Sequence, residues 1–395
     1  MHFYYLCEVF SPISLKMKIL YCIAGLDNAG GTERVVLRKA NYLAEHTGHD
    51  IHILVCGKDR RKSFFPVSPK IQIHDLGVHS YNGLHFRTAR RRMSRFLPEL
   101  RPDICITTGG KELFILSGMN DGSRKICEFH FARNRMKLKY RGRFLGNIRS
   151  IRYQRRFEKA LAGMDAFVVL TREDREAWRK VFPDTVQIYN PCPEPSGDTA
   201  QLDAKRCIAI GRLEDQKNYP DMIRAWVEVN RRHPDWELDI YGSGRQSTMI
   251  EKMICRAGLK DKVHLMGTTQ DIPRELISHS CLLLTSRYEG FPMVLLEAAI
   301  YGIPAVSYRC QSGPSEIIED GASGFLVDPG DTDGFADCIC RIIEDSDLRK
   351  EMGARSIKTA ERFRIGTVMA EWERLFAGQN AAQNGNLGEW AQSVS

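Results

Sequence analysis

The chain has 395 residues, of which 43% are hydrophobic and 27% charged; these values are typical of globular proteins, and the length gives room for two domains. No apolar run approaches the roughly 18 residues that span a bilayer, so we expect no transmembrane helix. Several of the 12 cysteines lie in apolar runs and none has metal-ligand spacing, so we expect neither a disulfide framework nor a cysteine-bound metal, and we expect a cytoplasmic protein.

The positive charge is concentrated in one part of the chain. The net charge is +8, but residues 80–160 alone contain 20 lysines and arginines against 6 aspartates and glutamates. Such an asymmetry suggests an anionic partner for the first half of the chain, namely a membrane surface, a phosphorylated substrate or a nucleic acid.

The amino-terminal segment 1–16 is a poor signal peptide, because it lacks a basic start and a clean apolar stretch. Translation from Met17 would begin one residue before the first strand, and the sequence does not choose between Met1 and Met17. Residues 18–24 form an apolar run that predicts a buried parallel strand. A turn with Gly30 and Gly31 follows, and we expect Thr32 to cap a helix that extends through Ala44.

A second strand at 51–55 completes a βαβ unit. The glycines of the intervening turn allow a close approach of a ligand to the main chain, although their spacing is not that of a dinucleotide-binding turn. Further strands are predicted at 103–107 and 125–130, and His130 lies at the end of the latter. A lone histidine in this place is more often structural than catalytic.

Residues 133–159 combine eleven basic side chains with interleaved apolar ones, and Arg90, Arg91, Arg92 and Arg95 form a second basic cluster. A basic amphipathic segment is typical of attachment to an anionic membrane surface. A solvated basic face explains the pattern too. Binding to nucleic acid is the third alternative, but no nucleic-acid-binding motif is present, so we expect none.

A strand at 166–171 precedes a helix that Thr171 is expected to cap, and the proline-rich segment 191–204 predicts a linker between two domains. Beyond it strands and helices alternate again, with predicted strands at 206–213, 236–241, 263–268, 282–285, 305–308 and 321–327. Two such halves predict two doubly wound α/β domains, with ligands at the carboxyl ends of the strands. Residues 366–376 are expected to form a last helix, and 379–395 a disordered tail.

The stretch 286–299 is the most informative part of the sequence. Pro292 suits the first position of a helix, and Gly302 suits the left-handed residue that ends it. The helix between them is apolar all round, which predicts burial, and Glu297 is its one carboxylate. A buried carboxylate needs hydrogen-bond donors, which two ribose hydroxyls would supply. Glu289 stands beside a helix start whose free N–H groups attract anions such as phosphate.

Three motifs together resemble the family 4 retaining glycosyltransferases of GT-B fold. They are the two glutamates Glu289 and Glu297 around Gly290-Phe291-Pro292, the Gly-Arg-Leu…Gln-Lys-Asn segment with Arg212 and Lys217, and the Gly-Gly-Thr-Glu-Arg turn with Gly30 and Gly31. The resemblance covers residues 18–376 and is strongest in the second half. The plain structural alternatives are a capped core helix for the first motif, surface cations in a loop for the second and a tight turn before a helix for the third.

The resemblance implies a role for each matching residue. Glu297 would hold the ribose, Glu289 would lie near the donor sugar, and the main-chain N–H groups of Gly290, Phe291, Met293 and Val294 would meet the diphosphate. Arg212 and Lys217 would neutralise the departing nucleoside diphosphate. Gly30 and Gly31 would border the donor and acceptor phosphates, His130 would lie beside the donor sugar, and Gly242 and Gly267 would lie at the donor nucleotide.

We therefore expect a retaining transferase that moves a sugar, from a UDP-hexose or UDP-N-acetylhexosamine, to a glycan or lipid-linked glycan in envelope polysaccharide biosynthesis. No metal-binding Asp-x-Asp motif is evident, so we expect no metal and no cofactor beyond the nucleotide-sugar donor. We expect attachment at the inner face of the cytoplasmic membrane. A non-catalytic sugar-nucleotide-binding subunit and a nucleotide-sugar epimerase remain alternatives.

The expected segments are an extension at 1–16, an acceptor-side domain at 17–190, a linker at 191–204, a donor-binding domain at 205–365, a returning helix at 366–378 and a tail at 379–395.

Overall fold

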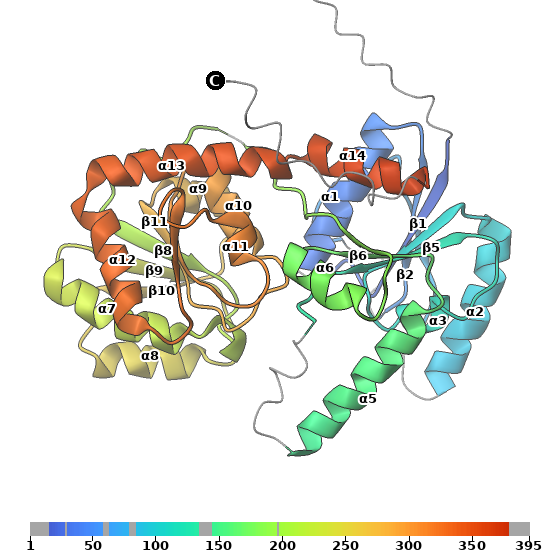
Figure 1. The fold of residues 1–395 in the computed structure, drawn as a ribbon, viewed down its shortest axis with the longest axis horizontal. Helices are drawn as coiled ribbons and strands as arrows, with labels where there is room; N and C mark the ends of the chain where they lie inside the picture. The colour runs from blue at the N-terminus through green and yellow to red at the C-terminus, as the bar shows by residue number, and fades with distance from the viewer. Residues whose placement is uncertain are drawn as a thin grey trace, which may run out of the picture. The chain divides into compact units, whose positions relative to one another are not determined.

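The computed structural model describes residues 16–27, 30–57, 63–78, 84–133, 144–195 and 197–378. The chain forms two compact units, the first made of residues 1–128, 163–166 and 369–395, and the second of residues 129–162 and 167–368. Two parallel β-sheets with helices on their faces make up the fold (Figure 1). The domain boundaries that the sequence predicts stay a prediction, as do the expected extension and tail, which lie almost wholly outside the described residues.

The first sheet has seven parallel strands in the order β3-β2-β1-β4-β5-β6-β7. The strands are β1 (Lys18–Ile23), β2 (Asp50–Val55), β3 (Gln72–Asp75), β4 (Ile104–Thr107), β5 (Arg124–Phe129), β6 (Ala166–Val169) and β7 (Thr185–Gln187). Ile19 of β1 pairs with Ile51 on one side and with Ile104 on the other, so the central strands are apolar and buried on both faces. Within the described residues, the helices of this half are α1 (Gly31–His46), α2 (Leu84–Leu100), α3 (Leu113–Leu116), α5 (Phe144–Leu161) and α6 (Arg172–Arg179).

The start of α1 differs from the sequence-based expectation. Gly30, in extended backbone, is the N-cap residue, and no side chain caps the helix. The helix begins at Gly31, so Thr32, the expected cap, lies inside the first turn. The expected cap of α6 is confirmed, since the Thr171 hydroxyl accepts a hydrogen bond from the Asp174 N–H at 3.1 Å.

The second sheet has six parallel strands in the order β10-β9-β8-β11-β12-β13. They are β8 (Arg206–Ile210), β9 (Glu237–Tyr241), β10 (Val263–Gly267), β11 (Cys281–Leu284), β12 (Ala305–Tyr308) and β13 (Gly324–Val327). The helices are α7 (Tyr219–Arg232), α8 (Ser247–Arg256), α9 (Ile272–Ile277), α10 (Met293–Ile300), α11 (Pro314–Ile317), α12 (Thr332–Glu344) and α13 (Ser346–Ala360), with short 3₁₀ helices at Asp215–Lys217 and Glu361–Phe363. Trp226 and Phe335 lie in one apolar core with the strands.

The last helix, α14 (Ile365–Phe376), ends in the first unit. There the Lys39 ammonium lies 4.3 Å from the centre of the Trp372 ring and forms a buried ion pair with Glu128. His49 Nε2 lies 3.0 Å from a carboxylate oxygen of Glu373. These contacts fix the end of the helix against α1 and the first strands.

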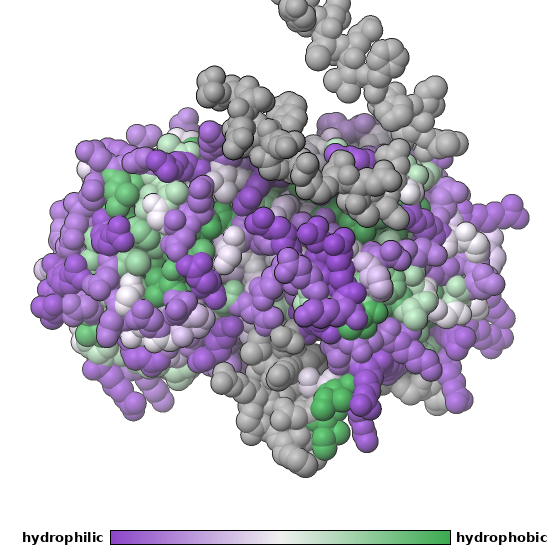
Figure 2. Space-filling view, viewed as in Figure 1, coloured by the Kyte–Doolittle hydropathy of each residue, from purple (hydrophilic) through white to green (hydrophobic). Residues whose placement is uncertain are grey.

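Hydrophilic residues cover much of the described surface in the view of Figure 2. Within the described ranges, every helix is too short or too polar to serve as a membrane span.

Candidate functional site

The order of the second sheet places its two central loops side by side. Strands β8 and β11 are hydrogen-bonded neighbours, with Cys207 opposite Cys281, although seventy residues of chain separate them. Their connections lead to opposite ends of the sheet, and in a doubly wound sheet this switch point is where the carboxyl ends of the strands form a ligand crevice. The loop 211–218 follows β8, and the loop 285–292 follows β11.

An ion pair joins these two loops. Lys217 Nζ lies 2.7 Å from Glu289 Oε1, and the Ser286 hydroxyl donates a hydrogen bond to the same oxygen at 2.6 Å. The side chains of Lys217 and Glu289 are only 15% and 9% exposed. The structure thus brings together two of the predicted site residues and pairs their charges in a place largely withdrawn from water.

Hydrogen bonds to the main chain hold both loops in register. The Gln216 amide donates to the carbonyl of Tyr288 at 2.9 Å, and the N–H of Arg287 donates to the carbonyl of Gln216 at 2.8 Å. The Thr285 hydroxyl donates to the carbonyl of Lys217 at 3.1 Å. Sequence reasoning missed the roles of Gln216, Ser286 and Thr285; the polar Thr-Ser pair directly after the apolar strand β11 was the available signal.

Helix α10 begins next to this pair. Its eight residues are all buried, as predicted, and Gly302 after it has a φ of +73°, which confirms the expected left-handed end. Pro292, expected as the first helical residue, is instead the N-cap residue, with extended backbone (ψ 91°). Met293 and Val294 therefore occupy the first turn, where N–H groups have no acceptor within the helix and the helix dipole favours an anion.

Glu297 lies one turn further along the same helix, four residues after Met293, so that both are on one helix face. Its side chain is 4% exposed. A carboxylate at this depth requires hydrogen-bond donors around it.

Gly290 is in direct contact with the His130 loop. A Cβ added to Gly290 would lie 2.2 Å from the carbonyl oxygen of His130 and 3.1 Å from the Cα of Phe131. No side chain fits at this position. The main chain of the Glu-Gly-Phe-Pro segment therefore lies in direct contact with the main chain that follows β5. His130 itself is buried (8% exposed), and the structure thereby brings it to the same segment as Glu289.

The loops after β9 and β10 lie next to the loop after β8. The N–H of Gly242 donates to the carbonyl of Gly267 at 2.6 Å, and the N–H of Gly211 donates to the carbonyl of Tyr241 at 2.9 Å. A Cβ on Gly242, whose φ is +147°, would lie 1.9 Å from the carbonyl oxygen of Gly211. Gly242 is therefore required by the close packing of three loops, whereas Gly267 has open space around it.

The remaining predicted site residues are Arg212, Gly30 and Gly31. Arg212 is exposed, and its guanidinium makes one long hydrogen bond to Gln216, at 3.4 Å, so it is able to turn toward a ligand. Gly30 and Gly31 lie in the first unit, at the start of α1, and a Cβ on Gly31 would meet nothing within 4 Å.

A second set of polar contacts supports Phe291 and Pro292. A Cβ on Gly313 would lie 2.4 Å from Pro292, and the neighbouring Ser312 N–H donates to a carboxylate oxygen of Glu173 at 3.0 Å. Glu316 accepts hydrogen bonds from the N–H of Arg172 at 2.7 Å and from the Tyr189 hydroxyl at 2.7 Å. The start of α6 thus holds the loop that packs behind Pro292. Burial raises the pKa of Asp174, in the same turn of α6, to about 6.

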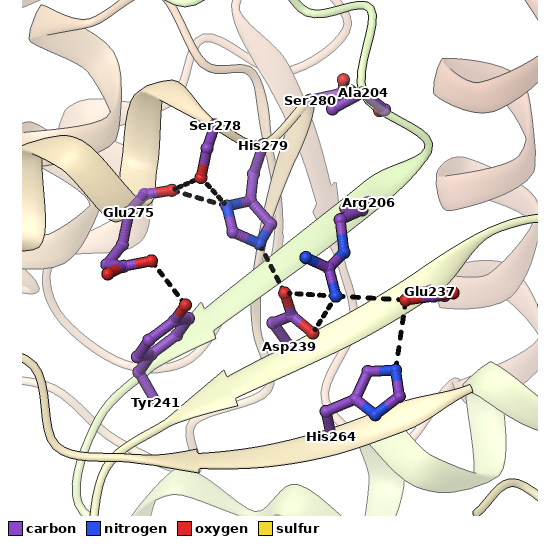
Figure 3. A network of polar contacts seen from close by, with 10 residues as sticks. All are labelled: Ala204, Arg206, Glu237, Asp239, Tyr241, His264, Glu275, Ser278, His279 and Ser280. Carbon is purple, nitrogen blue, oxygen red and sulfur yellow. Dashed lines mark hydrogen bonds and ion pairs between the residues drawn. The ribbon is translucent and has the colours of Figure 1, made fainter. Parts of the chain in front are cut away.

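Figure 3 shows a polar network on β8, β9 and β10 of the same sheet. Asp239, fully buried, lies 3.0 Å from His279 Nε2 and 3.2 Å from the Arg206 guanidinium. Arg206 also bonds Glu237 at 3.1 Å, and Glu237 lies 3.2 Å from His264. Each buried charge has an opposite partner, so this network is explained by packing of the sheet.

Among the described residues, one group has the side-chain types of a metal site. The ligand atoms of His233, Cys340 and Glu344 lie within 4.8 Å of one another. However, Glu344 already pairs with His233 at 2.9 Å and with Arg232 at 3.1 Å. Burial raises the pKa of the Cys340 thiol to about 11, which opposes the thiolate that a metal needs. Ion pairing accounts for this group.

Comparison with known proteins places both halves of the chain. Residues 198–359 match the family model described as Glycosyl transferases group 1, and residues 29–193 match the one described as Glycosyltransferase Family 4. The amylovoran biosynthesis glycosyltransferase AmsD of Erwinia amylovora is 26% identical over 374 residues, a match that covers 91% of this chain and 99% of that protein.

A second relative comes from Campylobacter jejuni. It is the GalNAc-alpha-(1->4)-GalNAc-alpha-(1->3)-diNAcBac-PP-undecaprenol alpha-1,4-N-acetyl-D-galactosaminyltransferase, 24% identical over 371 residues, with 91% of this chain and 98% of that protein covered. A crystal structure of an S. aureus TarM mutant in complex with fondaparinux, alpha-GlcNAc-glycerol and UDP superposes with a TM-score of 0.76 at 15% identity, covering 91% of this chain and 99% of that chain. This likeness identifies the two doubly wound sheets as a GT-B fold.

We predict that Gly290→Ala destabilises the protein, because the new methyl group would meet main-chain atoms of His130 and Phe131 that have no room to move. Overpacking of this kind typically costs about 1–3 kcal/mol in the free energy of unfolding, as measured by urea denaturation. Gly48→Ala is the control, because a Cβ on Gly48 meets nothing within 4 Å. Equal stabilities of the two variants would contradict the close approach at Gly290.

Proposed function

Since this chain belongs to the glycosyl transferases group 1 and is a hexosyltransferase of envelope glycan biosynthesis, we propose that it is a retaining enzyme that moves a hexose or N-acetylhexosamine from its UDP donor to a glycan or lipid-linked glycan. The observation that carries the proposal is the convergence of Lys217, Glu289 and the start of α10 at the switch point of the second sheet. A cation, a carboxylate and free N–H groups in one place suit a sugar diphosphate.

The first step is the exchange of ion-pair partners by Lys217. In the free protein its ammonium is neutralised by Glu289. A diphosphate at the start of α10 offers Lys217 a stronger acceptor, and the exposed Arg212 can turn to add a planar pair of donors. Glu289, still held by the Ser286 hydroxyl, is then free to accept a hydrogen bond from a sugar hydroxyl.

Positive charge around the leaving phosphate favours retention of configuration. Arg212, Lys217 and the N–H groups of α10 stabilise the negative charge that develops as the glycosidic bond breaks. A phosphate oxygen can then take the proton of an acceptor hydroxyl that attacks from the same face. Inversion would need a general base on the opposite face. Glu289, which in this proposal accepts a hydrogen bond from a hydroxyl of the donor sugar, and His130, enclosed beside Gly290, are not suited to that role. We place His130 beside the donor sugar.

The choice of donor and acceptor rests on the relatives. The TarM structure contains UDP and alpha-GlcNAc-glycerol, and the Campylobacter relative is named for the transfer of N-acetylgalactosamine to an undecaprenyl-diphosphate-linked oligosaccharide. AmsD is named for the biosynthesis of amylovoran. A UDP-sugar donor and a glycan or lipid-linked glycan acceptor are therefore the first substrates to test.

We expect Glu297→Gln, which keeps the volume of the buried side chain, to weaken UDP binding by the loss of a charge-assisted hydrogen bond pair. Such bonds contribute about 1.5–3 kcal/mol, so the dissociation constant measured by calorimetry should rise roughly 10- to 100-fold. Glu351→Gln on the exposed face of α13 serves as the control. An unchanged affinity for UDP in Glu297→Gln would remove the ribose-binding role from this residue.

The transfer reaction itself is predicted to proceed in EDTA, since Arg212, Lys217 and α10 supply the positive charge. For the same reason, Arg212→Ala should slow transfer far more than Arg245→Ala in the neighbouring exposed loop.

Proton NMR of the first product from an α-linked UDP-sugar should show an α-glycoside. A β-glycoside, or a strict requirement for magnesium or manganese, would refute the mechanism. Donor conversion without acceptor would identify an epimerase, and no conversion a binding subunit.

We also propose that the protein attaches to an anionic membrane surface through residues 133–159. Residues 134–143 of this segment lie outside the described ranges, but α5 exposes Ile148 (38%) and Ile151 (54%) beside Arg149, Arg152 and Arg155. Arg152→Gln/Arg155→Gln should therefore reduce sedimentation with anionic vesicles, and added salt should reduce it in the wild type because charges are screened beyond about 8 Å. Equal binding to neutral vesicles would argue against this attachment.

A further inference from the structure

The first unit contains a cavity of about 470 Å³ between α2 and the segment that leads from α3 to β5. Its residues are distinct from those of the donor site: Arg87, Arg90, Arg91, Ser94, Leu97 and Pro98 on one side, and Gly118, Met119, Asn120 and Asp121 on the other. This volume is within the range of small-ligand sites in proteins.

Three arginines of the cavity lie on one face of α2. Arg87, Arg90, Arg91 and Ser94 have the spacing i, i+3, i+4 and i+7, which brings them together on the helix surface. Like charges at this spacing repel each other, and Glu99, near the helix end, is the one acidic residue of α2. Within the described ranges, no carboxylate forms an ion pair with any of the three guanidinium groups, so their charge is uncompensated.

The opposite wall does not supply the missing negative charge. Asp121 is its one carboxylate, but Asp121 pairs with Lys125 at 2.7 Å and accepts a hydrogen bond from the Ser123 hydroxyl at 2.8 Å. Its side chain is turned inward, with 4% exposed. The Arg90 guanidinium lies over Gly118, 3.7 Å from where a Cβ would stand, so the absence of a side chain at this position keeps the cavity open beside the cation.

The basic run of α2 is divided between two purposes. Arg92 is turned away from the cavity, and its guanidinium donates to the carbonyls of Leu76, at 3.0 Å, and Gly77. Arg92 therefore fixes α2 to the end of β3, while Arg90 and Arg91 remain available. If α2 only presented a solvated basic face, there would be no reason for Arg92 to be bonded to the main chain while Arg90 and Arg91 are not. There would also be no reason for a concave wall opposite the arginines.

The cavity has an apolar end as well. Leu97, Pro98 and Met119 line it, and Leu97 and Pro98 lie about two turns beyond Arg90 along α2. A ligand that fits this cavity has a phosphate group, which the arginines would bind, next to a hydrocarbon chain, which the apolar end would contact. We propose that this cavity binds the phosphate of a lipid headgroup, from either an anionic membrane lipid or the diphosphate of a lipid-linked glycan. The inference that an anion binds here is drawn from the arginines and the cavity alone. The inference that this anion belongs to a lipid rests on the proposed function.

Calorimetry of the full-length protein with dihexanoyl phosphatidic acid, below its micelle concentration, tests the site. Arg90→Gln should weaken binding about tenfold or more, because the shorter, neutral Gln side chain stays polar but loses the charge-assisted hydrogen bonds. The matched control is Arg95→Gln, which removes the same charge from an exposed position of the same helix outside the cavity and should change binding less than twofold. Arg87→Gln/Arg90→Gln/Arg91→Gln should abolish it.

Two further measurements identify the source of the phosphate. Cavity-dependent binding to phosphatidylcholine vesicles that contain phosphatidylglycerol assigns it to the bilayer, whereas cavity-dependent binding only to vesicles that contain a polyprenyl diphosphate assigns it to the acceptor. Equal losses of phosphatidic acid binding in Arg90→Gln and Arg95→Gln would overturn the proposal. It would also be overturned if dihexanoylglycerol, which lacks phosphate, bound as tightly as the phosphatidic acid, or if duplex DNA bound more tightly.

Binding of UDP to the same variants separates this inference from the proposed function. UDP affinity should be equal in the wild type and the triple variant, because Lys217, Glu289 and Glu297 lie in the second unit and the three arginines in the first. Failure of the wild type to bind UDP would remove the proposed donor while leaving the lipid phosphate site intact. Loss of lipid binding together with a fall in the unfolding temperature of Arg90→Gln would count against a binding role.

Discussion

The ion pair between Lys217 and Glu289 is the interaction on which the arrangement of the site depends. Removing two charges from water is costly, and a pair at this depth is stable only when further hydrogen bonds satisfy it. Here Ser286 supplies one such bond, and the hydrogen bonds from Gln216 and Thr285 fix the main chain on both sides of the pair. The pair therefore keeps the cation and the carboxylate in place without a ligand. In the proposed function, an arriving phosphate meets a preorganised site, because it needs only to replace one partner of Lys217.

The geometry of the parallel sheet explains why this pair can form at all. The order β8-β11 makes neighbours of two loops that are distant in sequence, and both leave the sheet at the carboxyl ends. Helix α10 then points its first turn at the same place, because an all-apolar helix must be buried between the sheet and α13. Contacts with no room for a side chain, at Gly242 and Gly290, bring neighbouring loops to main-chain distance. The site that we propose for a nucleoside diphosphate is thus a consequence of strand order, one buried helix and a few glycines.

Arginine residues serve several purposes in this protein, and their number alone does not distinguish them. Arg206 neutralises a buried aspartate in the sheet, and Arg349 donates to the main-chain carbonyls of Leu202 and Ile342. Arg92 holds α2 to the preceding loop. Arg87, Arg90 and Arg91 have no such partner in the described part of the chain. The local charge of residues 80–160 indicates an anionic partner, but only the surroundings of each guanidinium separate a structural arginine from one that can meet a ligand.

The sequence by itself determined the features that local physics controls: the apolar runs of the central strands, the left-handed turn at Gly302, the Thr171 cap, the burial of α10 and the two doubly wound halves, together with the family that the Glu289–Glu297 motif indicates. Only the tertiary structure decided which residues meet: Lys217 with Glu289, Gly290 with the His130 carbonyl, and Glu173 with the loop behind Pro292. It also revealed β3, a short exposed edge strand without an apolar pattern, and moved the start of α1 ahead of Thr32. The physical reason is that strand and helix periodicity extends over a few residues, whereas charge pairing and main-chain contact depend on the order of strands in a sheet, which no local pattern encodes.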